Sequence, residues 1–267
     1  MLPSTEYVEA VERTLDSTFT FKCHKDISCF NKCCHHTDML LTPYDILRMK
    51  KRLGISSTEF LQKYTHTHID EKSSHPFAVL TMNEDEEGSC PFLTPEGCSV
   101  YEDRPANCRY YPVGKGLMIR DTTDGPAPVD FYFFIRQPTC RGYDEGREIS
   151  IAEWRAAQGV DVYDQMNREW QEIQLRRDNP GKPKLDDQKQ ALMYMASYDL
   201  DQFRKFVFES GFLNLFELDK DEVEKMRDDD VALMKFGFKY MKYILMLEET
   251  LKLKDEFQKE NKPANVN

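Results

Sequence analysis

The stretch SCFNKCCHHTDML, residues 28–40, concentrates three cysteines and two histidines between positions 29 and 36. Two of the cysteines, Cys33 and Cys34, are adjacent. Thiols bind soft metal ions strongly and react with oxidants, so this density is unusual for a loop that only connects two elements. The stretch therefore indicates metal or redox chemistry.

The placement of the cysteines supports this interpretation. All of them lie before residue 141 of the 267-residue chain. Cysteines that serve only as small apolar core residues would be scattered through the whole core. In a reducing compartment an even count indicates metal or redox chemistry, and inert core thiols or a disulfide scaffold are the alternatives. The eight candidate metal ligands are Cys23, Cys29, Cys33, Cys34, Cys90, Cys98, Cys108 and Cys140.

The spacings are C-x5-C-x3-C-C, then C-x7-C-x9-C, then a single cysteine. Four thiolates suffice for one tetrahedral zinc or one iron–sulfur cluster, and eight suffice for two sites or a larger one. The C-x2-C pairs of ordinary zinc fingers are absent from these spacings. In extended backbone Cys33 and Cys34 would point apart and reach two metal ions or two corners of a cluster. The pattern favours a polynuclear site, and the expected metal is iron as a cluster, in preference to zinc.

Composition and charge bound the class of protein. The net charge is −11 and the sequence pI is about 5.1, so we expect no nucleic-acid partner. No apolar run approaches the roughly 18 residues of a membrane span, and the N-terminus has no signal-peptide pattern. With 40% hydrophobic residues the chain can bury a core. We expect a cytoplasmic protein without a membrane partner.

The chain divides by pattern into a cysteine-cluster metal-binding region, residues 1–148, and a helical region, residues 149–267. Short strands are predicted at 18–23, 77–82, 98–101, 116–120 and 130–135. A helix is predicted from Pro43, capped by Thr42 and ended by Gly54, with a second over 56–64. A Ser150–Glu153 capping box predicts a helix that runs toward Gly159, and further helices are predicted over 161–177 and 186–209 and once or twice after 220. Breaks are predicted at NPGKPK and in the tail QKENKPANVN. The expected fold is α+β: a small cysteine-rich lobe with short strands, held by metal, packs on a mainly helical C-terminal lobe.

Three segments carry a family resemblance: FKCHKDISCFNKCC, CPFLTPEGCSVYEDRPANCRYYP and CRGYDEGR. They closely resemble the YkgJ-type cysteine-cluster family, which is described as chelating zinc or iron. The resemblance covers roughly residues 19–147, and the C-x5-C-x3-C-C spacing is slightly longer than the commonest form. The residues that match the family pattern in the last two segments are Cys98, Val100, Tyr101, Arg104, Pro105, Cys108, Arg109, Tyr111, Pro112, Cys140 and Gly142.

Other side chains near the cysteines have two readings each. His35 and His36 could complete a metal shell or lie in a solvated loop. Arg104 and Arg109 could stabilise an anionic thiolate cluster, or pair with nearby acidic residues or a helix end. The H-x-H pair at residues 66 and 68 has no cysteine near it in sequence and is expected at the surface.

The sequence leaves three classes of function open. It contains no nucleotide-binding glycine motif and no nucleophile elbow, so the metal site itself would have to run any reaction. The first hypothesis is a metal-held accessory module with a helical surface for a protein partner. The second is an iron–sulfur redox protein. The third, implied by the resemblance, is a metal-dependent enzyme related to flagellin lysine N-methylases. Whether the chain is an enzyme is left open; the expected cofactor is iron or an iron–sulfur cluster, with Zn²⁺ as the alternative.

Overall fold

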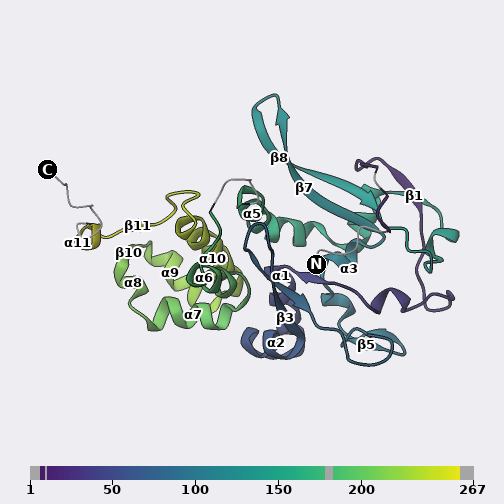
Figure 1. Cartoon of the computed structure of the whole chain (residues 1–267), viewed down its shortest axis with the longest axis horizontal. Helices are drawn as coiled ribbons and strands as arrows, with labels where there is room; N and C mark the ends of the chain where they lie inside the picture. The colour runs from purple at the N-terminus through teal and green to yellow at the C-terminus, as the bar shows by residue number, and fades with distance from the viewer. Residues whose placement is uncertain (1–6, 10, 178–182, 259–267) are drawn as a thin grey trace.

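The computed structural model describes residues 7–9, 11–177 and 183–258. Helices and strands are mixed, which confirms the α+β class (Figure 1). The helices are α1 (Pro43–Leu53), α2 (Ser57–Tyr64), α3 (Ala106–Tyr110), α4 (Ile151–Gln158), α5 (Asp161–Arg177), α6 (Asp187–Tyr198), α7 (Leu200–Glu209), α8 (Phe212–Leu215), α9 (Lys220–Asp228), α10 (Asp230–Ile244) and α11 (Asp255–Gln258). Three 3₁₀ turns are η2 (Lys32–Cys34), η3 (Tyr101–Asp103) and η4 (Gly142–Asp144).

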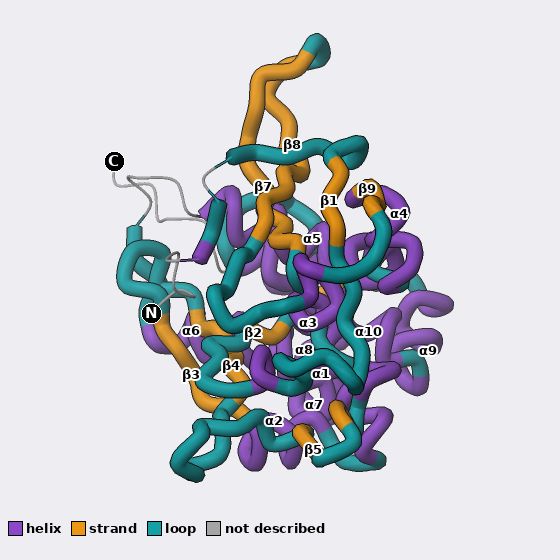
Figure 2. The backbone as a smooth tube through the Cα atoms, turned by 90° about the vertical axis from the view of Figure 1, so that its right-hand side faces the viewer, coloured by secondary structure: helices purple, strands orange, loops and turns teal. Residues whose placement is uncertain are grey.

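The strands form small antiparallel sheets. The longest is the hairpin of β7 (Val113–Thr122) and β8 (Gly125–Phe134), which projects from the body of the chain (Figure 2). A three-stranded sheet has the order β2-β4-β3, and β1 pairs with β9. The other strands are β1 (Thr18–Thr20), β2 (Leu40–Leu41), β3 (Thr65–Ile69), β4 (Pro76–Leu80), β5 (Leu93–Thr94), β6 (Gly97–Cys98), β9 (Glu148–Ser150), β10 (Phe216–Glu217) and β11 (Lys252–Leu253).

Two hydrophobic cores lie beneath these elements. The larger core joins α1 and α2 to the C-terminal helices; within it the rings of Tyr44 and Tyr163 meet edge to face at 5.1 Å. Its fully buried side chains therefore come from both sides of residue 148. The smaller core lies under the base of the β7–β8 hairpin and consists of Phe19, Phe21, Tyr110, Val113, Tyr132, Phe134, Ile151 and Val160. The cysteines lie around these two cores, so packing as well as chain path determines their positions.

The predicted start and end of α1 are confirmed. Thr42 and Asp45 form a reciprocal capping box, Pro43 occupies the first turn, and Gly54 ends the helix in the left-handed conformation. Asp45 is fully buried and also accepts a hydrogen bond from the backbone N–H of Ala106 at 2.8 Å. One carboxylate thus caps α1 and holds the start of α3, which carries Cys108.

Two other predictions differ from the structure. The single helix expected over 186–209 is wrong: it is broken at Asp199, whose backbone leaves the helical region with φ −99° and ψ 71°. The Asp199 carboxylate caps α7 through Gln202 and accepts hydrogen bonds from the hydroxyls of Ser57 and Thr58. The strand expected over 98–101 is also wrong beyond Cys98, since η3 begins at Tyr101. The predicted breaks at NPGKPK and in the tail fall largely on residues 178–182 and 259–267, which lie outside the described residues.

A buried histidine gives the fold a pH dependence that can be measured. His75 is 1% exposed, and burial, with the positive charge of Arg177, lowers its pKa to about 4. In the unfolded chain His75 binds a proton near pH 6.5, but in the folded protein it does so only near pH 4. The free energy of unfolding therefore decreases as the pH falls from about 6.5 to about 4. We expect a loss of about 3 kcal/mol from this residue. Urea unfolding at several pH values between 7 and 4 should show that the wild type loses more stability than His75→Phe as the pH falls. An equal dependence of unfolding free energy on pH in the two proteins would contradict this expectation.

In the part of the chain that the structure describes, no helix combines the length and apolarity needed to cross a bilayer.

Candidate metal centre

The doubled cysteine is brought to Cys90 by a short stretch of antiparallel pairing. The N–H of Cys90 donates to the carbonyl of Cys34 at 2.8 Å, and that of His36 donates to the carbonyl of Gly88 at 2.9 Å. A side chain at Gly88 would meet the His36 ring, since its Cβ would lie 2.5 Å from Nδ1. The glycine therefore permits this close approach, and the pairing joins two cysteine segments that are over 50 residues apart in sequence.

A small hairpin then places Cys98 close to Cys90. β5 and β6 pair Leu93 with Cys98, and the N–H of Leu93 donates to the carbonyl of Cys90 at 2.9 Å. Asn31, in the first cysteine segment, donates its side-chain amide to the carbonyl of Thr94 at 3.3 Å. Cys90 and Cys98 both pack against the larger core. The second cysteine segment is thus folded back on the first.

The last cysteine segment lies against the beginning of the first one. The N–H of Lys22 donates to the carbonyl of Gly142 at 2.9 Å, and His24 Nε2 lies 2.7 Å from the Glu145 carboxylate. The N–H of Arg141 lies 3.1 Å from Cys29 Sγ and donates to it. Amide donors of this kind stabilise thiolates and are common around protein-bound metal clusters. Cys23, Cys29 and Cys140 therefore belong to one neighbourhood.

The aromatic ring of Phe21 explains why a glycine follows Cys140 by two residues. A Cβ at Gly142 would lie 2.4 Å from the Phe21 ring. The same ring meets Tyr111, Tyr143 and Trp154 edge to face, with centroid separations between 5.3 and 6.1 Å. Phe21, two residues before Cys23, therefore packs on Gly142, two residues after Cys140, and this contact sets Cys23 beside Cys140.

Gly142→Ala is expected to disrupt this contact. The added methyl group overpacks the Phe21 ring, and we expect a loss of about 2 kcal/mol of folding stability together with weaker metal binding. Chemical unfolding and metal titration of the variant provide the measurement. Gly211→Ala is the matched control, because nothing lies within 4 Å of its Cβ. Equal stability and equal metal affinity for the two variants would show that Gly142 makes no such contact.

Cys108 enters the same region from α3. The residue as a whole is exposed, but desolvation of its thiol raises the pKa of Cys108, as do the like charges of Cys90 and Cys98. Tyr111, one residue beyond α3, links this segment to the last one: burial raises its pKa, as does a hydrogen bond with Cys140. The second and last cysteine segments thus adjoin.

The adjacent cysteines do not diverge as predicted. They lie on η2, where the backbone turns tightly instead of running extended. A hydrogen bond between the two thiols lowers the pKa of Cys33 to about 7, and the same bond raises that of Cys34. The charge of Cys33 also acts on Cys23, whose pKa burial and neighbouring thiols raise to about 11.

All eight thiols are free, so the sulfur donors are available. Among the described residues, no three Cys, His, Asp or Glu side chains already stand in an arrangement that could hold a metal ion. The assignment of the eight cysteines as metal ligands therefore stays a prediction. The donor set nevertheless fits zinc, iron or an iron–sulfur cluster, because these bind thiolates and the segments that carry the thiols contact one another.

The two arginines play different parts. Arg104 is buried, stacks on Tyr101 at 3.8 Å, and its positive charge acts on the thiol of Cys98. Arg109 instead braces backbone carbonyls: its guanidinium donates to those of Glu102, Arg104 and Gln158. The expectation of positive charge near the cysteines is therefore met by Arg104, and Arg109 holds the turn that precedes α3.

The histidines near the cysteines have other partners. His35 Nδ1 lies 3.2 Å from the carbonyl of Glu87, and the His36 ring lies against Gly88. His66 and His68 lie on β3, at the edge of the three-stranded sheet, where His66 contacts the hydroxyl of Thr81. Sequence reasoning missed Asp45 and Tyr111 as organisers of the cysteine segments. The signal for Tyr111 was its place in the motif, and the signal for Asp45 was its position in the first turn of the helix that begins at Pro43.

Free thiols carried on short strands and turns around the two cores provide donors that suit soft metal ions. Residues 22–143 match the CxxCxxCC family model, described as "Putative zinc- or iron-chelating domain". Residues 22–143, which contain all eight cysteines, are thus similar to the cysteine-cluster family that the motifs resemble. No curated protein matches the chain, and no solved structure matches it.

Proposed function

We propose that this protein binds iron through its clustered cysteines, as an iron–sulfur cluster, and serves an accessory or redox role. The observation that carries the proposal is the meeting of the three cysteine segments through backbone hydrogen bonds, with every thiol free. Thiols kept reduced at such proximity require a reducing compartment such as the cytoplasm, or a metal that holds them as thiolates. The family description supports the metal, and it names both zinc and iron.

Three features favour an iron–sulfur cluster over zinc. The cysteine segments offer sulfur donors, and His35, next to the doubled cysteine, has its Nδ1 3.2 Å from the carbonyl of Glu87. A backbone N–H donates to Cys29 Sγ, as hydrogen bonds to cluster sulfurs do in tuning the reduction potential. The charge of Arg104 near Cys98 offsets the negative charge that several thiolates bring. An iron–sulfur cluster in this setting would supply one-electron chemistry, and Zn²⁺ would supply structure alone.

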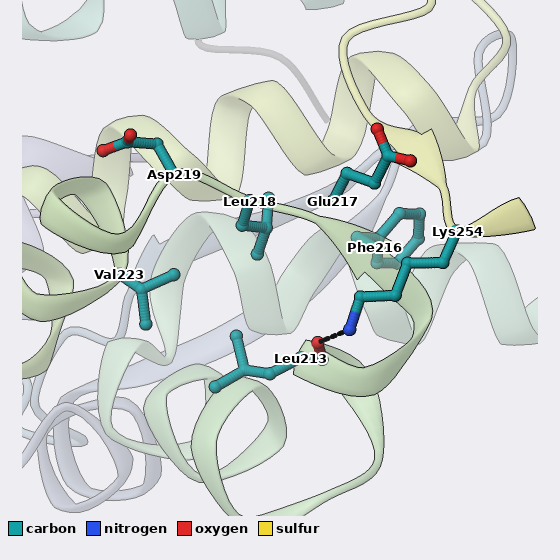
Figure 3. A pocket seen from close by; sticks show the side chains of 7 residues that line it. All are labelled: Leu213, Phe216, Glu217, Leu218, Asp219, Val223 and Lys254. Atoms are coloured by element: carbon teal, nitrogen blue, oxygen red, sulfur yellow. Dashed lines mark hydrogen bonds between the residues drawn. The ribbon is translucent and has the colours of Figure 1, made fainter.

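The helical region offers a surface for a protein partner, which stays a prediction. A hollow between α8 and α9 is lined by Leu213, Phe216, Leu218 and Val223 (Figure 3). Lys254 closes one side, where Nζ donates to the carbonyl of Leu213 at 3.1 Å. This hollow is remote in sequence from every cysteine. We therefore rank a metal-dependent enzyme related to flagellin lysine N-methylases behind the accessory or redox role.

Optical and magnetic spectra of anaerobically purified protein test the proposal. We expect a brown protein with thiolate-to-iron charge-transfer absorption and, after reduction with dithionite, an electron paramagnetic resonance signal from the cluster. Reversible bleaching would support the redox role. Stoichiometric zinc in a colourless preparation would overturn the iron assignment while leaving metal binding by the cysteines in place. Protein that binds neither metal would overturn the function as a whole.

A further inference from the structure

We propose that two copies of this chain pair along the outer edge of β7, the side of that strand that faces away from β8. The pairing continues the β7–β8 hairpin into a four-stranded antiparallel sheet. The hairpin projects from the body of the chain, so another molecule can reach this edge (Figure 2). The proposal goes beyond the proposed function, because it uses the backbone of the hairpin and no cysteine.

The hydrogen bonds of Tyr132 show which backbone groups of the hairpin point outward. Tyr132 lies opposite Lys115, yet its carbonyl accepts from the N–H of Arg13 at 2.7 Å and its N–H donates to the carbonyl of Arg13 at 3.3 Å. In an antiparallel ladder such outward-facing pairs alternate with pairs that bond to each other. Every second residue of β7 therefore directs both backbone groups to its outer edge: Val113, Lys115, Leu117, Ile119 and Asp121.

The outer edge of β8 is protected near both of its ends. Near the base, the N–H of Glu9 donates to the carbonyl of Phe134 at 2.9 Å, so the N-terminal segment covers the strand. Near the tip, Pro126 and Pro128 occupy outward positions and have no N–H, and Arg168 binds the carbonyl of Pro128 at 2.7 Å. Prolines and covering segments are the means by which proteins prevent pairing at a sheet edge.

The outer edge of β7 has no such protection. The strand contains no proline from Lys115 to Asp121. Within the described part of the chain, the outward backbone groups of this stretch make no hydrogen bond. Ile119 is 52% exposed, and Leu117 is half-buried. An edge strand with unpaired backbone groups and apolar side chains pairs readily with another strand. One edge of the hairpin is thus protected and the other is open.

A second copy fits this edge because the outward residues of β7 form a self-complementary set. When two β7 strands run antiparallel about Met118, Leu117 of one copy lies opposite Ile119 of the other, and Lys115 lies opposite Asp121. All four outward residues then exchange their backbone hydrogen bonds with one another. Apolar side chains meet in the centre and opposite charges meet at the ends, which stabilises antiparallel pairs. A two-fold axis relates the copies, as in most homodimers.

The other antiparallel registers that join outward residues are less favourable. An axis through Arg120 or through Asp121 sets that residue opposite its own copy, and like charges directly opposite each other are destabilising. An axis through Ile119 sets Leu117 opposite Asp121, and an axis through Leu117 sets Ile119 opposite Lys115. Each of these two registers places an apolar side chain against a charged one. The register about Met118 is therefore the one that the side chains select.

The charge of Lys115 remains available for a further partner. Its Nζ lies 3.3 Å from the carboxylate of Asp130 and 3.1 Å from that of Asp164. Each of these carboxylates also has an arginine of its own, Arg168 at 2.6 Å and Arg155 at 2.9 Å. The aspartate at the outer end of β7 has no ion pair among the described residues and can supply the carboxylate from the other copy.

Sedimentation velocity on anaerobically purified, full-length protein tests the pairing. We expect the wild type to shift from 31.4 kDa toward twice that mass as its concentration rises through the micromolar range. Ile119→Pro should stay at 31.4 kDa. This substitution removes an outward N–H, as Pro128 does on the opposite strand, and removes no bond within the hairpin. Ile119→Val is the matched control, because it keeps the N–H and an apolar side chain, and it should dimerise.

A change of charge tests the register. Asp121→Lys places a lysine opposite Lys115 of the other copy, and we expect it to raise the dissociation constant of the dimer about tenfold. Asp124→Lys changes the net charge of the chain equally, but in this register Asp124 lies opposite Pro112. It should therefore dimerise like the wild type. Equal dissociation constants for the two lysine variants would overturn the register about Met118.

Amide hydrogen exchange of the wild type, resolved residue by residue, gives a second measurement that needs no variant. The outward amides of Leu117 and Ile119 should exchange more slowly as the protein concentration rises, and the inward amides of Gly116 and Met118 should be protected throughout. A wild type that stays at 31.4 kDa and exchanges the outward amides freely at every concentration overturns the proposal. A dimer that persists in Ile119→Pro also overturns it. Neither result bears on metal binding by the cysteines.

Discussion

Cys33→Ser is expected to release about half or more of the bound metal and to lower the melting temperature by roughly 10 °C. The residue lies at the junction of the cysteine segments, and its thiol interacts with Cys34 and Cys23. Loss of a structural metal ligand removes folding free energy directly, on the order of 4 kcal/mol. For a chain of this size each kcal/mol shifts the melting temperature by about 2–4 °C. Metal analysis and calorimetry on anaerobic samples measure the two effects together.

Two comparisons make this result specific. Met246→Ser also removes a sulfur, but at a side chain 89% exposed, and should leave metal content and melting unchanged. Metal-stripped wild type and metal-stripped Cys33→Ser should melt at nearly the same temperature, since the difference between the holo forms comes from the metal. If holo Cys33→Ser keeps its metal and melts like the wild type, Cys33 is not a structural ligand.

Asp45→Ala is expected to destabilise the protein by about 3 kcal/mol and to weaken metal binding although Asp45 is not proposed as a ligand. Its carboxylate accepts from the N–H groups of Thr42 and Ala106, each at 2.8 Å, with no exposed surface. Burial raises its pKa to about 6, so the charged form persists at neutral pH with these donors around it. The substitution leaves both donors buried and unpaired. It also frees the start of α3, on which Cys108 is carried.

Asp219→Ala is the matched control for this change. Asp219 also accepts from two backbone N–H groups, at the start of α9, but it is exposed and lies in the helical region. Its loss should cost about 1 kcal/mol and leave metal affinity unchanged. Urea unfolding gives the stabilities and competition with a chelator gives the affinities. Undiminished affinity in Asp45→Ala would show that α3 does not contribute to the metal site.

Local features of the fold were predictable because their signals lie within a few residues. The capping box of α1 and its glycine end are written between Thr42 and Gly54, and the structure has both. The break at Asp199 was not predictable in the same way. It depends on hydroxyls of α2, more than 140 residues away in sequence. β3 was missed because THTHI is a polar edge strand with few buried side chains.

The candidate site also has features that the sequence predicts and features that depend on long-range contacts. The cysteines stand out in the sequence by number and placement, and the motif matches the family model over residues 22–143. The way they group depends on long-range pairings such as Cys90 with Cys34, which no spacing reveals. The wrong expectation for Cys33 and Cys34 came from assuming extended backbone where the chain forms a 3₁₀ turn. The need for glycine at position 142 becomes clear only from the structure, which places the Phe21 ring against it.

X-ray absorption at the metal edge of anaerobically purified, full-length protein tests most directly the claim that these cysteines hold metal. We predict a first coordination shell of sulfur alone at about 2.3 Å. An additional iron–iron shell would identify a cluster. A first shell dominated by nitrogen or oxygen, or protein free of iron and zinc after anaerobic purification, would contradict the account.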